Sequence, residues 1–290
     1  MLPRLIFVTG KGGTGKSTVA AAMAMALARR RPTMLADLDR RRSALWLLCA
    51  SNGDGDLAKN LEGVALSPHA ELEGFIERIV PVKAISRRML KSRTFGYVTA
   101  ALPGLEAFLM LERLRIMAGE AALKDRYVVV DGPASGSALE LLSVADGVKE
   151  IAPVGTLNRI ASGVHSFLID ESRFGVALTL TPEEMALRET LETADALRNR
   201  IGIRWIAAVL NATAKPLFDA VELAALSMLK PHAQLARRRN AIADLTHRAR
   251  EQLMAAGLEV IELPTLFLPE LGKREAVQLA DKIERALPQA

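Results

Sequence analysis

One glycine-rich stretch decides the fold: Gly10-Lys11-Gly12-Gly13-Thr14-Gly15-Lys16-Ser17-Thr18. It fits the phosphate-loop pattern G-x-x-x-x-G-K-[S/T], and it lies between an apolar run and a helical pattern, which is the context that such a loop requires. Glycines let backbone N–H groups turn toward phosphates, and the positive end of the following helix adds to the attraction. We expect Lys16 to reach the β- and γ-phosphates as a catalytic residue and the Ser17 hydroxyl to ligate Mg²⁺. The expected nucleotide contacts are Gly10, Gly12, Gly13, Thr14, Gly15, Lys16, Ser17 and Thr18.

Short β-rich runs alternate with longer helical patterns along the chain. This alternation predicts a three-layer α/β fold with a mostly parallel sheet and helices on both of its faces. Pro182 is expected in the first turn of its helix, where Glu183 and Glu184 favour the positive end of the helix dipole. The expected strands are Leu5–Thr9, Thr33–Asp37, Tyr127–Val130, Val176–Thr181, Trp205–Asn211 and Glu259–Leu263, and the main expected helices are 14–30, Pro182–Arg200 and Gln234–Ala256.

Two stretches depart from this rhythm. Residues 51–63 are rich in turn-forming residues and are expected to form a mobile loop. Residues 70–120 contain no clear strand and are expected to form a mostly helical surface region. No internal repeat or low-complexity linker divides the chain, so residues 1–290 are predicted to be a single domain.

Composition restricts the class of protein. Half of the 290 residues are hydrophobic, yet no apolar stretch approaches the roughly 20 residues that a membrane-spanning helix needs. The N-terminus is a poor signal peptide, and the single cysteine, Cys49, excludes an internal disulfide. These features together predict a cytoplasmic protein.

Positive charge is the second bulk feature, with 38 Lys and Arg against 33 acidic residues. Three arginine clusters carry part of it, at Arg29–Arg31, Arg40–Arg42 and Arg237–Arg239. Such clusters are either a solvated basic surface or a surface that attracts phosphate, from nucleic acid or from a nucleotide. Aromatic residues make up only 4% of the chain, which argues against stacking platforms for single-stranded nucleic acid.

Two acidic residues follow expected strands at the edge where ligands bind in parallel sheets. Asp39 follows the second strand, and Asp131 follows the third, after four apolar residues. Because phosphoryl transfer requires Mg²⁺ and a positioned water molecule, we expect both carboxylates to contribute to the metal site. The alternative for either residue is a helix N-cap.

Asn211 stands at the end of the fifth expected strand. An asparagine amide can bond both N6 and N7 of adenine, whereas guanine usually requires a carboxylate a few residues further on. No such carboxylate follows Asn211, so the sequence favours ATP over GTP. The alternative for Asn211 is a turn residue that only ends the strand.

Lys11 adds a specific signature to the phosphate loop. A second lysine at this position, in K-G-G-x-G-K-S, resembles the deviant Walker motif. In ATPases of that class two subunits face each other across their nucleotides, and this lysine reaches the phosphates of the partner subunit. The resemblance therefore implies that Lys11 is catalytic and acts across a dimer, as an arginine finger does in other enzymes.

Further segments are similar to the arsenite-pump and tail-anchored-protein-targeting ATPases within this class. The run that begins at Asp131 resembles their switch II, in which Ser135 and Gly136 would respond to the γ-phosphate, and Leu263-Pro264 resembles the loop that covers adenine. Asp39 resembles the switch I aspartate that orients the attacking water. The sequence departs from the pattern of these ATPases at two places: Arg40–Arg42 follow Asp39, and Ser137 stands where they usually have a histidine. The other matching segments are Leu102-Pro103-Gly104-Leu105-Glu106 and the run from Thr181 to Thr190.

The resemblance implies a Mg²⁺-dependent, slow ATPase that works as a dimeric switch, either as a homodimer or as a heterodimer with a paralogue, on a protein or membrane client. Cys49 alone does not suit arsenite binding, and a C-x-x-C zinc motif is missing. A hydrophobic client site would be reduced in this chain, because only the short segment Thr156–Phe174 occupies its place. Methionines such as Met89, Met110 and Met117 could contribute to such a site, and the alternative for these methionines is packing in the core. The alternative function is a ParA- or MinD-type positioning ATPase that binds DNA nonspecifically when ATP is bound, and the matching segments favour it less.

Overall fold

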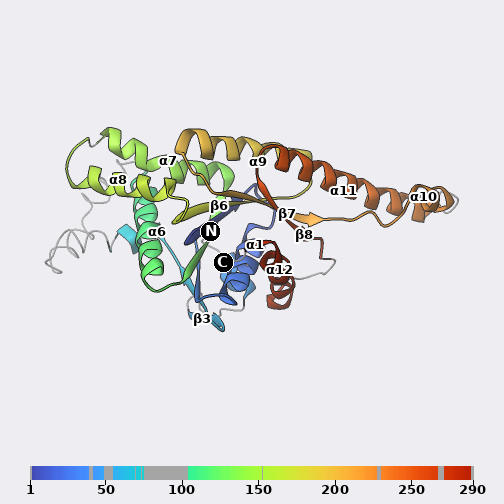
Figure 1. Cartoon of the computed structure of the whole chain (residues 1–290), viewed down its shortest axis with the longest axis horizontal. Helices are drawn as coiled ribbons and strands as arrows, with labels where there is room; N and C mark the ends of the chain where they lie inside the picture. The colour runs from blue at the N-terminus through green and yellow to red at the C-terminus, as the bar shows by residue number, and fades with distance from the viewer. Residues whose placement is uncertain are drawn as a thin grey trace, which may run out of the picture.

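The computed structural model describes residues 2–38, 42–48, 55–68, 70–72, 74, 104–151, 153–226, 230–266 and 271–288. The predictions for Asp39, Arg40, Arg41, Cys49 and Met89 therefore lie outside the described residues, as does most of the expected helical region at 70–120. The described part confirms the predicted class, an α/β fold in which a mostly parallel sheet lies between two layers of helices (Figure 1).

Within the described residues, the sheet has eight strands in the order β3-β4-β2-β5-β1-β6-β7-β8. All neighbouring strands run parallel except β3 and β4, which pair antiparallel. Strand β1 is central, between β5 and β6, so the loop that follows it opens at the middle of the carboxyl edge of the sheet. The strands are β1 (Leu5–Gly10), β2 (Thr33–Asp37), β3 (Gly55–Ala58), β4 (Leu61–Ala65), β5 (Tyr127–Ala134), β6 (Phe174–Leu180), β7 (Ile206–Thr213) and β8 (Glu259–Pro264).

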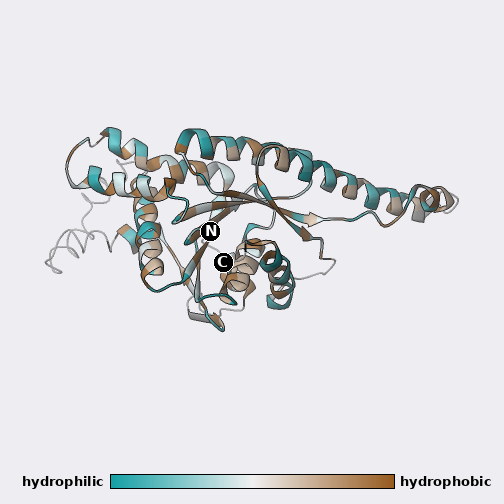
Figure 2. Cartoon of the chain, viewed as in Figure 1, coloured by the Kyte–Doolittle hydropathy of each residue, from teal (hydrophilic) through white to brown (hydrophobic). Residues whose placement is uncertain are grey.

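Helices cover both faces of the sheet, and alternation along the buried strands sends side chains to each layer. In β1, Leu5 and Phe7 join the core beneath α6 (Leu105–Leu123), α7 (Ser135–Ile151), α8 (Thr156–Ile169), α9 (Glu184–Ala196) and α11 (Lys230–Ala255). Ile6 and Val8 join the opposite core, beneath α1 (Lys16–Ala28), α2 (Ser43–Leu47) and α12 (Lys273–Ala286). Figure 2 shows this pattern as brown strands between helices whose outer faces are largely teal.

Helix α1, which carries the functional loop at its N-terminus, is buried on nearly all sides. It packs between the sheet and α12, and nine of its thirteen residues are buried. A helix buried on both sides is expected to be apolar all round, and its alanines let the neighbouring elements approach closely. Helix α12 covers it with Leu279 and Ile283, while Arg29 at the end of α1 pairs with Asp281 and Glu284. Helix α1 is thereby held between the sheet and α12.

The prediction of a mobile loop at residues 51–63 is wrong for the residues of this stretch that the structure describes. Residues from Gly55 onward form the antiparallel hairpin of β3 and β4, joined at Asn60, whose φ is +62°. Leu57 and Leu61 are buried at 6% and 1% exposure, and this burial stabilises the short strands. Asparagine tolerates the left-handed conformation that tight hairpin turns need. The turn residues that predicted a loop belong to this hairpin.

Two helix boundaries also differ from the prediction. Helix α9 begins at Glu184 with an extended Glu183 as its N-cap, so Pro182 precedes the first turn instead of lying in it. A π-helical turn, Leu197–Ile201, continues α9, and α11 begins at Lys230, earlier than expected. Within α6, Met110 and Met117 are each 3% exposed, which confirms core packing for these two methionines.

Helix α10 (Ala220–Leu226) and the first turns of α11 project beyond the sheet, at the right of Figure 1. No described helix combines the length and the apolar character that crossing a bilayer requires.

Candidate nucleotide site

The phosphate loop lies where the strand order places ligands in this type of fold. It leaves β1 at the carboxyl edge of the sheet and leads directly into α1. The ends of β5 and β6 flank it, and the Thr9 hydroxyl donates to the Pro133 carbonyl at 2.6 Å, which joins the ends of β1 and β5. The predicted context of strand, loop and helix is therefore present.

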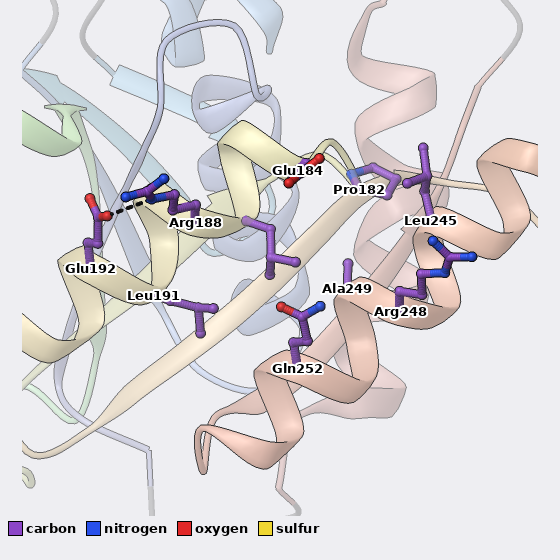
Figure 3. A pocket seen from close by; sticks show the side chains of 10 residues that line it. Pro182, Glu184, Arg188, Leu191, Glu192, Leu245, Arg248, Ala249 and Gln252 are labelled. Carbon is purple, nitrogen blue, oxygen red and sulfur yellow. Dashed lines mark hydrogen bonds and ion pairs between the residues drawn. The ribbon is translucent and has the colours of Figure 1, made fainter.

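Of two cavities formed by the described residues, one includes the loop. The larger, of about 490 Å³, lies between α9 and α11. Its lining includes Leu187, Leu191 and Leu245 beside the charged Arg188 and Arg248, and none of its lining residues belongs to the phosphate loop (Figure 3). The smaller, of about 240 Å³, has the loop itself as one wall. The smaller cavity is therefore the candidate nucleotide site.

Glycine is required at three positions of the loop. Gly13 and Gly15 have φ values of +85° and +89°, and Gly15 is the N-cap of α1. Gly10 has a φ of +148°, and a Cβ atom there would lie 2.0 Å from the carbonyl oxygen of Thr179 on β6. The left-handed backbone lets the loop turn its N–H groups inward. Gly10 keeps the start of the loop pressed against β6.

Replacing Gly10 with alanine is expected to destabilise the fold by about 2–4 kcal/mol, because a backbone clash adds to the strain of positive φ. Urea unfolding would measure this loss. Gly119→Ala is the matched control, since Gly119 lies within α6 with nothing within 4 Å of an added Cβ. Equal unfolding midpoints for the two variants would contradict the clash.

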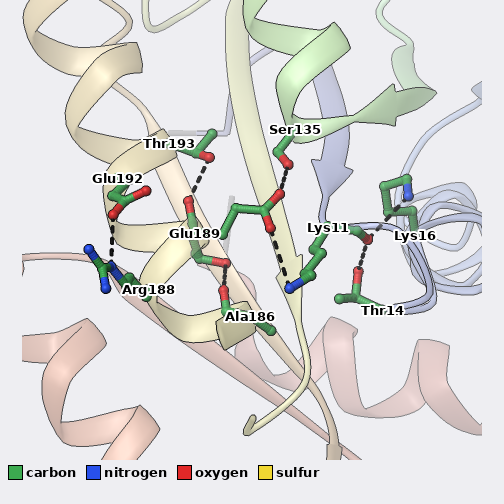
Figure 4. Close-up of polar contacts among 10 residues, drawn as sticks. Lys11, Thr14, Lys16, Ser135, Ala186, Arg188, Glu189, Glu192 and Thr193 are labelled. Carbon is green, nitrogen blue, oxygen red and sulfur yellow. Dashed lines mark hydrogen bonds and ion pairs between the residues drawn. The ribbon is translucent and has the colours of Figure 1, made fainter. Parts of the chain in front are cut away.

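The side chains of the loop converge on one carbonyl group. The Lys11 carbonyl accepts hydrogen bonds from the Thr14 hydroxyl at 2.8 Å and from Lys16 Nζ at 3.3 Å (Figure 4). The Lys16 ammonium therefore lies across the loop, on the side where α1 begins. An ammonium held by a single carbonyl can exchange that partner for a phosphate oxygen without leaving the loop.

The Lys11 side chain extends away from the loop toward α9. Its Nζ lies 3.7 Å from Glu189 Oε2, and the two side chains are 37% and 38% exposed. The other oxygen of Glu189 accepts a hydrogen bond from the hydroxyl of Ser135, the first residue of α7 (Figure 4). Ser135 itself is 3% exposed. Glu189 thus joins the signature lysine to the segment that resembles switch II.

The smaller cavity brings the predicted base-binding residues to the loop. Asn211 lies at the end of β7, and its Nδ2 donates to the Thr14 carbonyl at 2.9 Å. Pro264 ends β8 beside it, and bonds between Thr213, Leu263 and Thr265 hold the two strand ends together. The lining residues are Gly13, Thr14, Gly15, Thr18, Thr181, Asn211, Ala212, Pro264, Thr265, Leu266, Leu271 and Leu279.

Two buried carboxylates lie side by side next to the loop. Asp37 of β2 pairs in register with Asp131 of β5, and they are 0% and 1% exposed. Asp37 accepts the backbone N–H groups of Ala44 and Leu45, so it acts as a cap for α2. Asp131 is one of the residues predicted as metal ligands, together with Ser17 and Asp39, and Asp39 lies outside the described residues.

The donors near the loop fit a magnesium ion chemically. Ser17 lies in the first turn of α1, and Asp131 ends the apolar part of the adjacent strand β5. Hydroxyl and carboxylate oxygens are the hard ligands that Mg²⁺ prefers, usually together with water and substrate phosphates. Within the described ranges, no group of three or more His, Cys, Asp or Glu side chains forms a closed metal cage.

Sequence reasoning missed several residues of the site. Glu189 was noticed only as part of the segment from Thr181 to Thr190, without a partner. Ala212, whose φ is +55°, follows Asn211 and lines the cavity, although alanine gives no sequence signal for a left-handed turn. The apolar cavity residues Leu266, Leu271 and Leu279 likewise carry no motif.

Comparison with known proteins adds independent findings. The family model described as anion-transporting ATPase matches residues 3–156. The chain is 26% identical over 208 residues to the ATPase BagA of Mycobacterium tuberculosis, covering 67% of this chain and 61% of that protein. It is 29% identical over 212 residues to the arsenical pump-driving ATPase of Escherichia coli, covering 70% of this chain and 34% of that protein. The matched region thus spans less than two thirds of the length of either relative.

Proposed function

Since this chain belongs to the anion-transporting ATPase family, we propose that it is a Mg²⁺-dependent ATPase that cycles slowly through an ATP-bound dimer and acts on a protein or membrane partner. The observation that carries the proposal is the phosphate loop with its two lysines, which opens into a cavity that contains Asn211 and Pro264. The family supports ATPase chemistry in general, and the roles of individual residues are our proposal for this chain.

Each residue of the loop has a definite task in this proposal. Lys16 and the N–H groups at the start of α1 bind the phosphates, because both present positive charge at the same point. Ser17 and Asp131 hold Mg²⁺, which neutralises charge on the phosphates when it is bound. We assign the positioning of the attacking water to Asp39, on the strength of the resemblance to switch I.

Lys11 supports the dimeric part of the proposal. The lysine is not needed to build the phosphate cradle, since its side chain points toward α9 and not into the loop (Figure 4). A cation at this place is useful when it approaches a nucleotide from outside, in a dimer of two copies or with a paralogous subunit. It would then stabilise charge on the phosphates as hydrolysis proceeds.

The base site predicts a preference for adenine. One N–H of the Asn211 amide is used by the Thr14 carbonyl, and the amide still has a second N–H and a carbonyl oxygen for N7 and N6 of adenine. Asn211→Ala is expected to weaken ATP binding about fivefold to tenfold and to narrow the difference between ATP and GTP. Titration with both nucleotides measures this effect. Asn199→Ala, which alters an exposed asparagine bonded to Asp195, should leave both affinities unchanged.

The wild-type protein provides the direct test of the proposed function. Phosphate release would be measured with Mg·ATP and with EDTA, and mass would be measured by light scattering with ADP and with a non-hydrolysable ATP analogue. We expect slow, Mg²⁺-dependent release and a dimer that forms or tightens only with the ATP analogue. A mass that does not change with the nucleotide would contradict the dimeric switch, and an absence of hydrolysis would contradict the ATPase activity.

The partner and the cellular location complete the proposal. A cytoplasmic location fits the single cysteine and the described helices, none of which could cross a bilayer. The relatives do not favour the alternative of a ParA- or MinD-type positioning ATPase. Salt-sensitive DNA binding that appears only with ATP would revive that alternative.

A further inference from the structure

Glu189 links two parts of the site that the proposed function needs to move. One carboxylate oxygen lies 3.7 Å from the Lys11 ammonium, and the other accepts the hydroxyl of Ser135. Lys11 belongs to the loop after β1, Ser135 begins α7, and Glu189 lies on α9. One side chain thereby joins three elements around the phosphate loop (Figure 4).

We propose that Glu189 is a positioning residue: it holds Lys11 within its own subunit before nucleotide binds, and it releases the lysine when ATP arrives. This inference rests on the proposed function, since it concerns what Lys11 does between cycles. In the held state Glu189 neutralises the charge that Lys11 would otherwise present to a nucleotide. In the released state that charge becomes available to phosphate.

The strength of the contact suits a reversible hold. Both side chains are more than one third exposed, so water screens the ion pair and keeps it weak. A triphosphate carries several negative charges and competes well for a lysine held by one carboxylate. A fully buried pair would resist this exchange, because either charge would be left without solvent when the pair separates.

The buried hydroxyl of Ser135 gives Glu189 a fixed orientation. Ser135 is 3% exposed and lies at the junction of β5 and α7, so it does not follow the motion of the exposed Lys11 side chain. Its hydrogen bond holds one oxygen of the carboxylate and leaves the other facing Lys11. A movement at the start of α7 would therefore change the hold on Lys11.

The fold of α9 does not depend on the Glu189 carboxylate. The helix packs through buried residues such as Ala186, Leu187 and Thr190, and the Thr193 hydroxyl bonds to the backbone carbonyl of Glu189 instead of its side chain. Glu192, one turn further along, pairs with Arg188 at 3.0 Å on the exposed surface. The same helix therefore carries one glutamate that contacts Lys11, Glu189, and one that does not, Glu192.

Glu189→Gln tests the proposal, with Glu192→Gln as the matched control. Binding of a fluorescent, non-hydrolysable ATP analogue would be titrated with Mg²⁺ at low salt, for each variant alone and combined with Lys11→Ala. We expect Glu189→Gln to lower the half-saturating concentration by about twofold to fivefold, the range that a half-exposed ion pair can supply. Ser135→Ala should act in the same direction but less strongly, and Glu192→Gln should have no effect.

The combined variant distinguishes positioning from simple repulsion. If Glu189 acts by holding Lys11, its substitution has no effect once Lys11 is alanine. An equal gain in the Lys11→Ala background would overturn the proposal, because the carboxylate would then only repel phosphate. An unchanged affinity of Glu189→Gln for the analogue, measured while the wild type binds it, would also overturn the proposal. If the wild type itself fails to bind the analogue, the proposed ATPase function and this inference fall together.

Discussion

Lys11→Ala is expected to lower the rate of ATP hydrolysis by about 10³-fold or more and to remove the ATP-dependent dimer. The expected loss follows the size of effects that cations supplied from a second subunit have on phosphoryl transfer. Binding of ATP to a single subunit should change only severalfold, since Lys16 and the start of α1 remain. Steady-state phosphate release and light scattering with a non-hydrolysable analogue measure the two effects separately.

The control for this variant is Lys59→Ala, which removes the same charge from the exposed turn between β3 and β4. Its rate and its mass should equal those of the wild type. A Lys11→Ala protein that keeps its rate while it loses the dimer would show that hydrolysis is completed within one subunit. A protein that keeps both would leave Lys11 with no role across an interface.

Lys16→Ala is expected to abolish productive ATP binding and to lower hydrolysis by about 10²- to 10³-fold. Lys16 is the first residue of α1, and its ammonium already lies within the loop on the Lys11 carbonyl. Its loss removes the positive charge that phosphates meet at the helix N-terminus. Calorimetric titration with ATP and a phosphate-release assay measure the two losses.

The fold of Lys16→Ala should be unaffected, because the only side-chain hydrogen bond described for Lys16 is the one within the loop. An unchanged unfolding midpoint together with lost binding would confirm a functional effect. If ATP still binds with wild-type affinity, the nucleotide is held elsewhere, and the cavity between α9 and α11 becomes the next place to examine.

The sequence predicted those features that depend on local pattern. Buried parallel strands are continuous apolar runs, so β1, β2 and β5 could be located within a few residues. The glycines and lysines of the loop could be recognised because phosphate binding fixes both their type and their spacing. Asn211 could be proposed from its place at a strand end, and the structure brings it to the loop.

Other features could not be predicted because they depend on distant contacts. The pairing of Glu189 with Lys11 joins elements far apart in the chain, and neither residue carries a local sign of it. The β3–β4 hairpin was mistaken for a loop, since two short strands around Asn60 present mostly turn chemistry and only burial of Leu57 and Leu61 reveals them. The start of α9 was misplaced because Glu183, as an extended N-cap, follows Pro182.

The two edges of the sheet bear on how copies of this chain can assemble. Unpaired edge strands invite a second molecule to continue the sheet, which is a route to aggregation. In the part of the chain that the structure describes, one edge strand, β3, has only four residues, and the other, β8, exposes Glu259 and Glu262 and ends at Pro264, which has no N–H to donate. Both edges therefore resist the addition of foreign strands. In the dimer that we propose, contacts between copies would therefore be made by side-chain surfaces, which could separate again with each turnover.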